Sequence, residues 1–188
     1  IIADGKHNGK PCYVMPLYPQ TFRDLINKEK NAIKLITLIL ELCKALKYIH
    51  GKDVFHRDIK PENILINGDS LVLADFGIAH FKDFKLTKKA DLLANRDYAS
   101  PEQREKGRAD RIEKHADIFA LGLIINECFT KQNPSGSDFK LIADSHPLYA
   151  SLDDLVANMI RQNPIDRPNI YTVITEIKYI HNKIKKNI

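Results

Sequence analysis

The chain has 188 residues, of which 44% are hydrophobic and 28% charged. This is enough for one globular domain with a sizeable core. The longest apolar runs, around residues 35–40 and 118–125, are too short to span a bilayer, which argues against a membrane-spanning protein. Charged residues interrupt the first ten positions, unlike a signal peptide, so we expect a cytoplasmic domain.

The formal net charge is +5, and the excess is concentrated near the end of the chain at Lys183, Lys185 and Lys186. No aromatic residues alternate with these lysines, as they would in a typical nucleic-acid-binding surface. We therefore interpret the segment as a solvated basic tail in preference to a nucleic-acid or membrane patch, and we expect no nucleic acid as a partner and no membrane span.

The three cysteines, Cys12, Cys43 and Cys128, are odd in number and lie far apart in the sequence. They lack the spacing of a metal site. We therefore predict that all three are buried, reduced thiols. Such thiols are typical of a reducing compartment, where disulfides are rare.

The first half of the chain predicts a strand followed by a long helix. The strand covers Tyr13–Leu17 and is closed by Pro16 and Pro19, which favour an extended linker. Lys6 and Lys10, which precede it, are predicted to lie in a polar loop. From about residue 30 to residue 50, apolar side chains recur at helical spacing.

Gly51 directly follows this helix, where a left-handed terminal residue is expected. Two apolar runs, Ile64–Ile66 and Leu71–Leu73, then flank the turn sequence Asn67-Gly68-Asp69-Ser70. This pattern predicts a β-hairpin. The hairpin lies directly after the polar loop 56–63 and directly before Asp75.

The second half is predicted to be mostly helical. Residues 78–97 have no clear period and predict a long loop, whereas Ala116–Thr130 is apolar nearly all round and predicts a buried helix. Further helices are predicted over Ser151–Arg161, with Ser151 as its N-cap, and over Ile170–Lys185. The expected fold class is therefore α+β, mostly α-helical, with a small β-hairpin.

The most informative segment is His56-Arg57-Asp58-Ile59-Lys60-Pro61-Glu62-Asn63, which is followed by Asp75-Phe76-Gly77. Phosphoryl transfer needs a carboxylate that accepts the proton of the attacking hydroxyl, oxygen ligands for magnesium and a cation near the phosphate. Residues 58, 60, 63 and 75 can supply these groups. The segment resembles the H-R-D-L-x-x-x-N and D-F-G motifs of eukaryotic-type protein kinases, with Ile in place of Leu.

Three later segments resemble further motifs of that family, in the same order. Residues 98–102 resemble the A-P-E motif that ends the activation segment, with Ser in place of Ala. Residues 117–122 resemble D-x-W-x-x-G, and residues 163–168 resemble the segment that carries a late arginine. In the family this arginine pairs with the A-P-E glutamate, which implies a buried ion pair between Glu102 and Arg167.

The resemblance implies a role for each polar residue of the motifs. Asp58 would orient and deprotonate the acceptor hydroxyl, and Lys60 would neutralise charge on the transferred group. Asn63 would complete the catalytic set and, with Asp75, would hold Mg²⁺ ions that bridge the ATP phosphates. A lysine at position 60 is typical of the serine/threonine branch, so a protein serine or threonine is the expected substrate.

The resemblance also implies an adenine site in the hinge. Met15 stands at the gatekeeper position, the backbone of Leu17 faces adenine, and Leu65 forms the floor beneath the ring. The residues expected to bind ATP with its Mg²⁺ are Met15, Leu17, Tyr18, Lys60, Glu62, Asn63, Leu65 and Asp75. Some basophilic kinases use the position of Glu62 to recognise an upstream arginine.

Other motif residues are expected to be structural or regulatory. By the resemblance, His56 packs beneath Phe76 instead of acting as a base, and Asp117 anchors the backbone beneath the catalytic loop. Arg57 resembles the arginine that pairs with a phosphate on the activation loop, for which Thr87 is the candidate site. Asn95 stands where serine/threonine kinases normally have a threonine.

The resemblance covers residues 1–188 as a partial kinase domain, namely the hinge and the large C-terminal lobe, with the activation segment at about 75–102. The glycine-rich loop, the V-A-I-K lysine and its glutamate partner have no counterpart in this sequence. A small lobe is therefore expected upstream, and without it we expect poor activity. The alternative is a pseudokinase-like binding module, motivated by Asn95, Ser100 and the missing lobe.

Overall fold

The computed structural model describes residues 2–68, 70–76, 97–104, 114–132 and 139–186. The loop predicted over residues 78–97 lies outside the described residues except for its last position, and so do Gly77, Thr87 and Asn95. Within the described part of the chain, no helix is long and apolar enough to cross a membrane.

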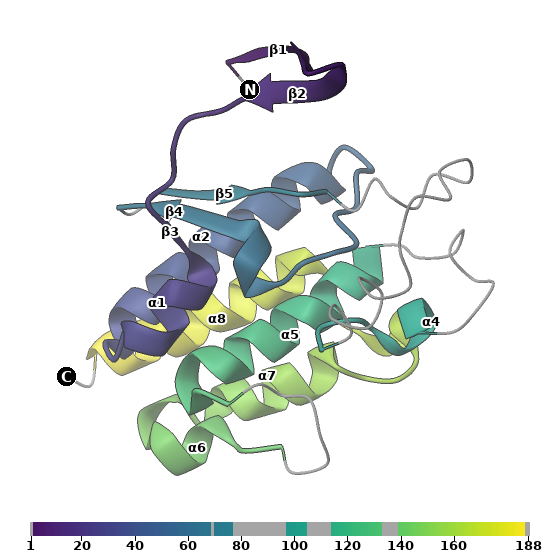
Figure 1. Cartoon of the computed structure of the whole chain (residues 1–188). Coiled ribbons are helices and arrows are strands. Elements are labelled where there is room, and N and C mark those ends of the chain that lie inside the picture. The colour runs from purple at the N-terminus through teal and green to yellow at the C-terminus, as the bar shows by residue number, and fades with distance from the viewer. Residues whose placement is uncertain (1, 69, 77–96, 105–113, 133–138, 187–188) are drawn as a thin grey trace.

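Helices form most of the molecule, and two small sheets lie at one side of them (Figure 1). The strands are β1 (Ala3–His7), β2 (Lys10–Val14), β3 (Gln20–Thr21), β4 (Ile64–Asn67) and β5 (Ser70–Leu73). The helices are α1 (Phe22–Lys28), α2 (Ala32–His50), α4 (Pro101–Arg104), α5 (Lys114–Thr130), α6 (Ile142–Ser145), α7 (Ser151–Met159) and α8 (Ile170–Lys186), with 3₁₀ turns at Pro61–Asn63, Pro147–Tyr149 and Pro164–Asp166. The mostly α-helical α+β prediction is confirmed.

The hairpin predicted after the polar loop is present as β4 and β5. The two strands pair antiparallel from Ile64 opposite Leu73 to Asn67 opposite Ser70, and β3 adds to the other edge of β4. Gly68 has a φ of +61° in the turn, a conformation that glycine adopts at little cost. The hairpin thereby connects the polar loop 56–63 to Asp75.

The N-terminal segment differs from the prediction. Lys6 and Lys10 lie in the paired strands β1 and β2, not in a loop, and β2 ends at Val14 instead of continuing to Leu17. Asn8 and Gly9 form the turn with φ of +50° and +76°, so this Asn-Gly pair was the hairpin signal. Every residue of β1 is exposed, which explains why the hydrophobic pattern did not reveal the strand.

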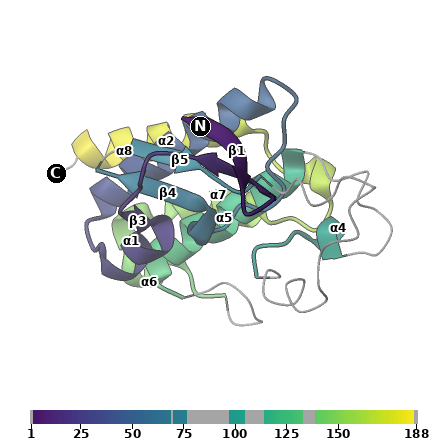
Figure 2. The same ribbon diagram turned by 45° about the horizontal axis from the view of Figure 1, so that its top comes forward.

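An extended segment, residues 15–19, joins this hairpin to the helical part of the chain (Figure 2).

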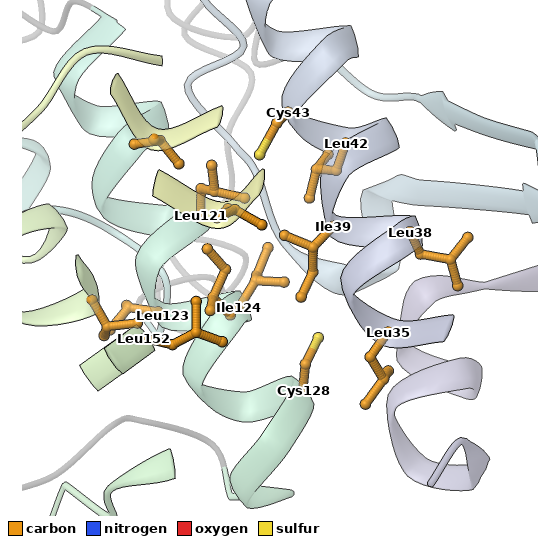
Figure 3. Packing of buried hydrophobic residues seen from close by; sticks show 14 of the residues in the cluster. Leu35, Leu38, Ile39, Leu42, Cys43, Leu121, Leu123, Ile124, Cys128 and Leu152 are labelled. Carbon is orange, nitrogen blue, oxygen red and sulfur yellow. The ribbon is translucent and has the colours of Figure 1, made fainter. Parts of the chain in front are cut away.

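The core is built around α5, which is buried along almost its whole length, as predicted. Side chains of α2, among them Ile39 and Cys43, face Leu121, Ile124 and Cys128 of α5 across the core (Figure 3). α7 and α8 also pack onto this pair of helices. Because the apolar residues of α5 point in every direction, no polar face needs solvent, and the helix can run through the middle of the domain.

Three local predictions about helix ends and cysteines were wrong. Gly51 has a φ of −69° and is right-handed, so α2 ends without a left-handed residue. Ser151 is the first residue of α7 and not its cap, because Ala150 stands at the N-cap position without a side-chain hydrogen bond. Cys12 is exposed on the N-terminal hairpin, whereas Cys43 and Cys128 are buried as expected.

The predicted C-terminal helix is confirmed as α8. Its buried face carries Ile170, Val173, Ile177, Ile180 and Ile184, with Ile174 partly buried beside them. The lysines of the basic tail, residues 183, 185 and 186, are exposed on the opposite side of the helix. Their solvation agrees with the interpretation of the tail as a solvated segment.

At Gly122, α5 closely approaches the end of α7. A Cβ atom at this position would lie 2.9 Å from the Cβ of Met159 and 3.0 Å from Cγ2 of Ile160. We predict that Gly122→Ala lowers the free energy of unfolding by about 1–2 kcal/mol, because overpacking outweighs the gain in helix propensity. Urea denaturation measures the change, and Gly5→Ala, which meets open space, is the matched control. A Gly122→Ala protein as stable as the control would contradict this packing.

Candidate active site

The catalytic-loop motif lies between the end of α2 and the start of β4, and its backbone is held from below by α5. The buried carboxylate of Asp117 accepts hydrogen bonds from the backbone N–H of His56 (3.0 Å) and of Arg57 (2.8 Å). Nε2 of His50 lies 2.8 Å from the same carboxylate. The predicted role of Asp117 as a backbone anchor therefore agrees with the geometry.

His56 is a packing residue of the loop. Its ring lies against Phe76 with a centroid distance of 4.6 Å, and its Nε2 is 2.9 Å from the carbonyl oxygen of Ala74. Burial lowers the pKa of the His56 imidazole below its ordinary value, so the neutral ring is favoured at neutral pH. The ring thus ties the loop to the strand end that carries Asp75, as the sequence predicted for a structural histidine.

Three predicted catalytic residues lie in direct contact. Nζ of Lys60 is 3.2 Å from Oδ2 of Asp58. Nδ2 of Asn63 donates to the same Oδ2 at 3.0 Å and to the backbone oxygen of Asp58 at 2.9 Å. The Asp58 carboxylate remains about one-third exposed, while Asn63 is buried. The loop therefore presents an oriented, accessible carboxylate next to a cation.

Asp75 follows β5 and lies at the end of the hairpin where β4 begins, next to the end of the catalytic loop. The N–H of Ala74 donates to the backbone oxygen of Asn63 at 2.9 Å, which aligns the residue before Asp75 with the end of the catalytic loop. Asp75 itself has a φ of +53°, an uncommon conformation for a residue with a side chain. Residues held in such conformations cluster at functional sites, where the surrounding structure compensates the strain.

Asn63 and Asp75 fit a shared magnesium site better than a closed metal cage. With Nδ2 of Asn63 directed at Asp58, its amide oxygen is the atom that can bind a hard cation. Within the described residues, no group of three His, Cys, Asp or Glu side chains could hold a metal alone. Magnesium is typically bound by one or two protein oxygens together with phosphates and water, so this sparse set is suitable.

Within the described chain, the residues predicted to surround adenine make no side-chain hydrogen bonds or ion pairs with one another. Met15 and Tyr18 are half-buried in the linker after β2, whereas Leu17 is 88% exposed. Leu65 is half-buried on β4. The exposed Leu17 side chain is compatible with the expectation that its backbone, not its side chain, contacts the base.

A charged network beside the catalytic loop was not recognised from the sequence. Arg23 of α1 donates through Nε to Glu62 (2.7 Å), through Nη1 to Glu127 of α5 (2.5 Å) and through Nη2 to the hydroxyl of Tyr98 (2.6 Å). Tyr98 also donates to Glu127. The network joins four segments that are far apart in the sequence, which is why no local pattern revealed it.

The electrostatic effects within this network are mutual. Burial alone would lower the pKa of the Arg23 guanidinium, but the hydrogen bonds to Glu62, Glu127 and Tyr98 raise it above its ordinary value. Burial, together with the hydrogen bond to Glu127, raises the pKa of the Tyr98 hydroxyl. Arg23 and Tyr98 therefore keep their protons, and the catalytic-loop residue Glu62 is tied to α1 and α5.

A second missed contact links the loop to α4. Gln103 accepts hydrogen bonds from the N–H of Ser100 (3.0 Å) and from its hydroxyl (3.1 Å), and donates through Nε2 to the backbone oxygen of Arg57 (2.6 Å). The sequence signal was present, since Ser-Pro-Glu-Gln has the spacing of a capping box. Its reach to Arg57, 46 residues away, follows only from the fold.

The predicted ion pair between Glu102 and Arg167 is present and bidentate. Nη1 and Nη2 of Arg167 lie 2.7 and 2.8 Å from the two carboxylate oxygens. The guanidinium also donates to the backbone oxygens of His115, Arg161 and Gln162 and stacks 4.9 Å above the ring of Phe119. Burial would raise the pKa of Glu102, but the hydrogen bonds from Arg167 lower it below its ordinary value.

Comparison with known proteins decides the family. The model of the protein kinase domain matches residues 8–180. The chain belongs to the protein kinase domain family. This kinase domain places its H-R-D segment at the loop described above, and Asp75 and Phe76 of its D-F-G segment at the end of β5.

Its relatives include serine/threonine kinases from distant organisms. A probable serine/threonine-protein kinase nek3 of Dictyostelium discoideum is 30% identical over 176 residues, covering 85% of this chain and 15% of the relative. Serine/threonine-protein kinase PknB of Mycobacterium tuberculosis is 30% identical over 167 residues, covering 78% and 26%. An Aurora kinase of Dictyostelium discoideum is 34% identical over 163 residues, covering 80% and 40%. The chain thus spans less than half the length of these relatives.

The Arg167 pair makes a stability prediction. We expect Arg167→Leu to lower the free energy of unfolding by about 3–5 kcal/mol, because it leaves a mostly buried carboxylate and three backbone oxygens without their partner. Denaturant unfolding at pH 7 measures the loss, with the exposed Arg161→Leu as the matched control.

The effect should also depend on pH. Because the folded-state pKa of Glu102 is depressed, the stability that it contributes is present above its unfolded pKa of about 4.5 and is lost as the pH falls through the folded value. The difference between wild type and Arg167→Leu should therefore shrink below about pH 4.5. An equal difference at pH 7 and at pH 3.5 would show that the ion pair is not its source.

Proposed function

We propose that this chain is the hinge and large lobe of a serine/threonine protein kinase, which transfers the γ-phosphoryl group of ATP to a serine or threonine hydroxyl of a protein. The observation that carries the proposal is the contact of the accessible Asp58 carboxylate with both Lys60 and Asn63. Such a set suits a reaction in which positioning and charge stabilisation supply most of the catalysis. The similarity to serine/threonine kinases supports this substrate class.

Each contact has a chemical use in this reaction. Asp58 would accept the proton of the substrate hydroxyl, and the hydrogen bond from Asn63 fixes the orientation of its carboxylate. The ammonium of Lys60, held beside Asp58, would stabilise negative charge on the transferred group. Because Asp58 is bound on one side and partly exposed, it can meet a substrate without rearranging the loop.

We further propose that Asn63 and Asp75 hold Mg²⁺ and that ATP lies between them and the hinge. The bound metal would neutralise charge on the phosphates. Met15, Leu17, Tyr18 and Leu65 complete the proposed nucleotide site; Glu62 also belongs to it, with its carboxylate held by Arg23. The buried, reduced Cys43 and Cys128 are compatible with a cytoplasmic location.

The proposed unit has two further components. Residues 75–102 would form the activation segment, with Thr87 as a phosphate acceptor that Arg57 recognises. Nε of Arg57 is buried and meets no hydrogen-bond partner within the described residues, which supports a role for this side chain in binding an anion. The family's glycine-rich loop and strand lysine have no counterpart in residues 1–188, so the reaction would need a small lobe from outside this chain.

The substitution Asp58→Asn tests the proposed catalytic role. We expect the turnover number for transfer from [γ-³²P]ATP to a serine/threonine protein substrate to fall about 10²–10⁴-fold, because the amide cannot accept the proton. The assay uses the full-length natural gene product, with a generic substrate such as myelin basic protein and with autophosphorylation as a second acceptor.

The control is Asp53→Asn, on an exposed turn with a φ of +53°, which asparagine tolerates well. This variant should retain the wild-type rate. Equal incorporation by wild type and Asp58→Asn, or none by either, would contradict the catalytic proposal. That outcome would favour the alternative, a pseudokinase-like binding module.

A further inference from the structure

The backbone of Arg57, the residue directly before Asp58, is in an uncommon conformation and is held from two sides. Its φ is +66°, in the left-handed region, which is unfavourable for a residue with a side chain. Its N–H is bound by Asp117 of α5 at 2.8 Å, and its carbonyl oxygen accepts from Nε2 of Gln103 at 2.6 Å. Such a conformation persists only where neighbouring groups fix it.

The side-chain amide of Gln103 performs two separate tasks with its two ends. Oε1 accepts from the N–H and the hydroxyl of Ser100, which satisfies the backbone N–H of the residue directly before α4. Nε2 donates out of α4 to the catalytic loop. The partners fix this orientation of the amide, because the Ser100 N–H can only donate and the Arg57 carbonyl can only accept.

The two tasks differ in what they require of the residue. The two contacts to Ser100 can be made equally well by glutamate or glutamine, because only an acceptor oxygen is needed. A carboxylate has no hydrogen to give to the Arg57 carbonyl, and two oxygens facing each other would repel. Glutamine is therefore the residue that satisfies both contacts at once.

We propose that Gln103 is a positioning residue for Asp58, which it orients by clamping the preceding peptide group from the end of the activation segment. The carbonyl of Arg57 and the N–H and Cα of Asp58 belong to one rigid peptide plane, so holding the oxygen restricts where the Cα that carries the Asp58 side chain can lie. The clamp also connects α4 to the loop, so a shift of Ser100–Arg104 would reach Asp58 directly. This inference rests on the proposed kinase function.

The substitution Gln103→Glu separates the clamp from the cap. We expect the turnover number to fall tenfold or more, since small misplacements of a catalytic group have effects of that size. The KM for ATP should stay within about twofold, because Gln103 contacts none of the proposed nucleotide-binding residues in the described structure. The melting temperature should stay close to that of wild type, because a glutamate oxygen can still accept from the N–H and the hydroxyl of Ser100.

Two further variants complete the experiment. Gln103→Met, which is uncharged and of similar size, removes the clamp and should lower the turnover number by a similar factor. Gln132→Glu makes the same charge change at an exposed position and should have the wild-type rate. A wild-type turnover number in Gln103→Glu would overturn the proposal. If the glutamate variant failed to fold, a wild-type turnover number in Gln103→Met would overturn it instead.

A readout independent of catalysis distinguishes this inference from the proposed function. Amide hydrogen exchange of Asp58 should accelerate in Gln103→Glu, because its peptide plane is no longer held, while exchange within α2 stays unchanged. If wild type and Asp58→Asn transferred phosphate equally, the kinase proposal would fail, and the exchange of Asp58 would still test the clamp. Unchanged exchange at Asp58 would overturn the clamp whatever the activity.

Discussion

The arrangement of the catalytic loop depends on one buried carboxylate. Asp117 lies in α5, the helix at the centre of the core, and its oxygens bind two successive backbone N–H groups of the loop as well as His50. A buried charge is tolerated only when it is hydrogen-bonded. The N–H groups of the loop therefore stabilise the Asp117 carboxylate, and the carboxylate in turn fixes the loop. The position of Asp58 is therefore tied, through the backbone of the two preceding residues, to the buried central helix α5.

Other contacts build outward from this anchor and draw the later segments to the loop. Gln103 holds the same peptide from α4, His56 joins the loop to the strand end before Asp75, and Arg23 binds Glu62 from α1. Arg167 then fixes Glu102, the neighbour of Gln103, against α5 and the turn before α8. These contacts come from α1, α4, the loop itself and the turn before α8, so the site is assembled by the packing of the whole lobe and not by the motif alone.

The sequence predicted those parts of this arrangement that follow from local hydrophobic patterns or from family motifs. The periodicity of α2 and α8, the apolar α5, the Asn-Gly turn of β4–β5 and the pair Glu102–Arg167 were all found where expected. The exposed β1–β2 hairpin was missed, because a strand without a buried face has no alternating pattern. The links made by Arg23 and Gln103 were missed because each joins residues 39 or more positions apart through side chains that are ordinary in sequence.

The most direct test of this account is amide hydrogen exchange of His56 and Arg57 in Asp117→Asn. Asparagine keeps one acceptor oxygen but replaces the other with an NH₂ group, so at least one of the two loop amides loses its acceptor. The account predicts that the amide that loses it exchanges about tenfold faster or more, whereas amides of α2 such as Leu42 keep their wild-type rates. Wild-type exchange at both His56 and Arg57 would contradict the claim that Asp117 holds the catalytic loop.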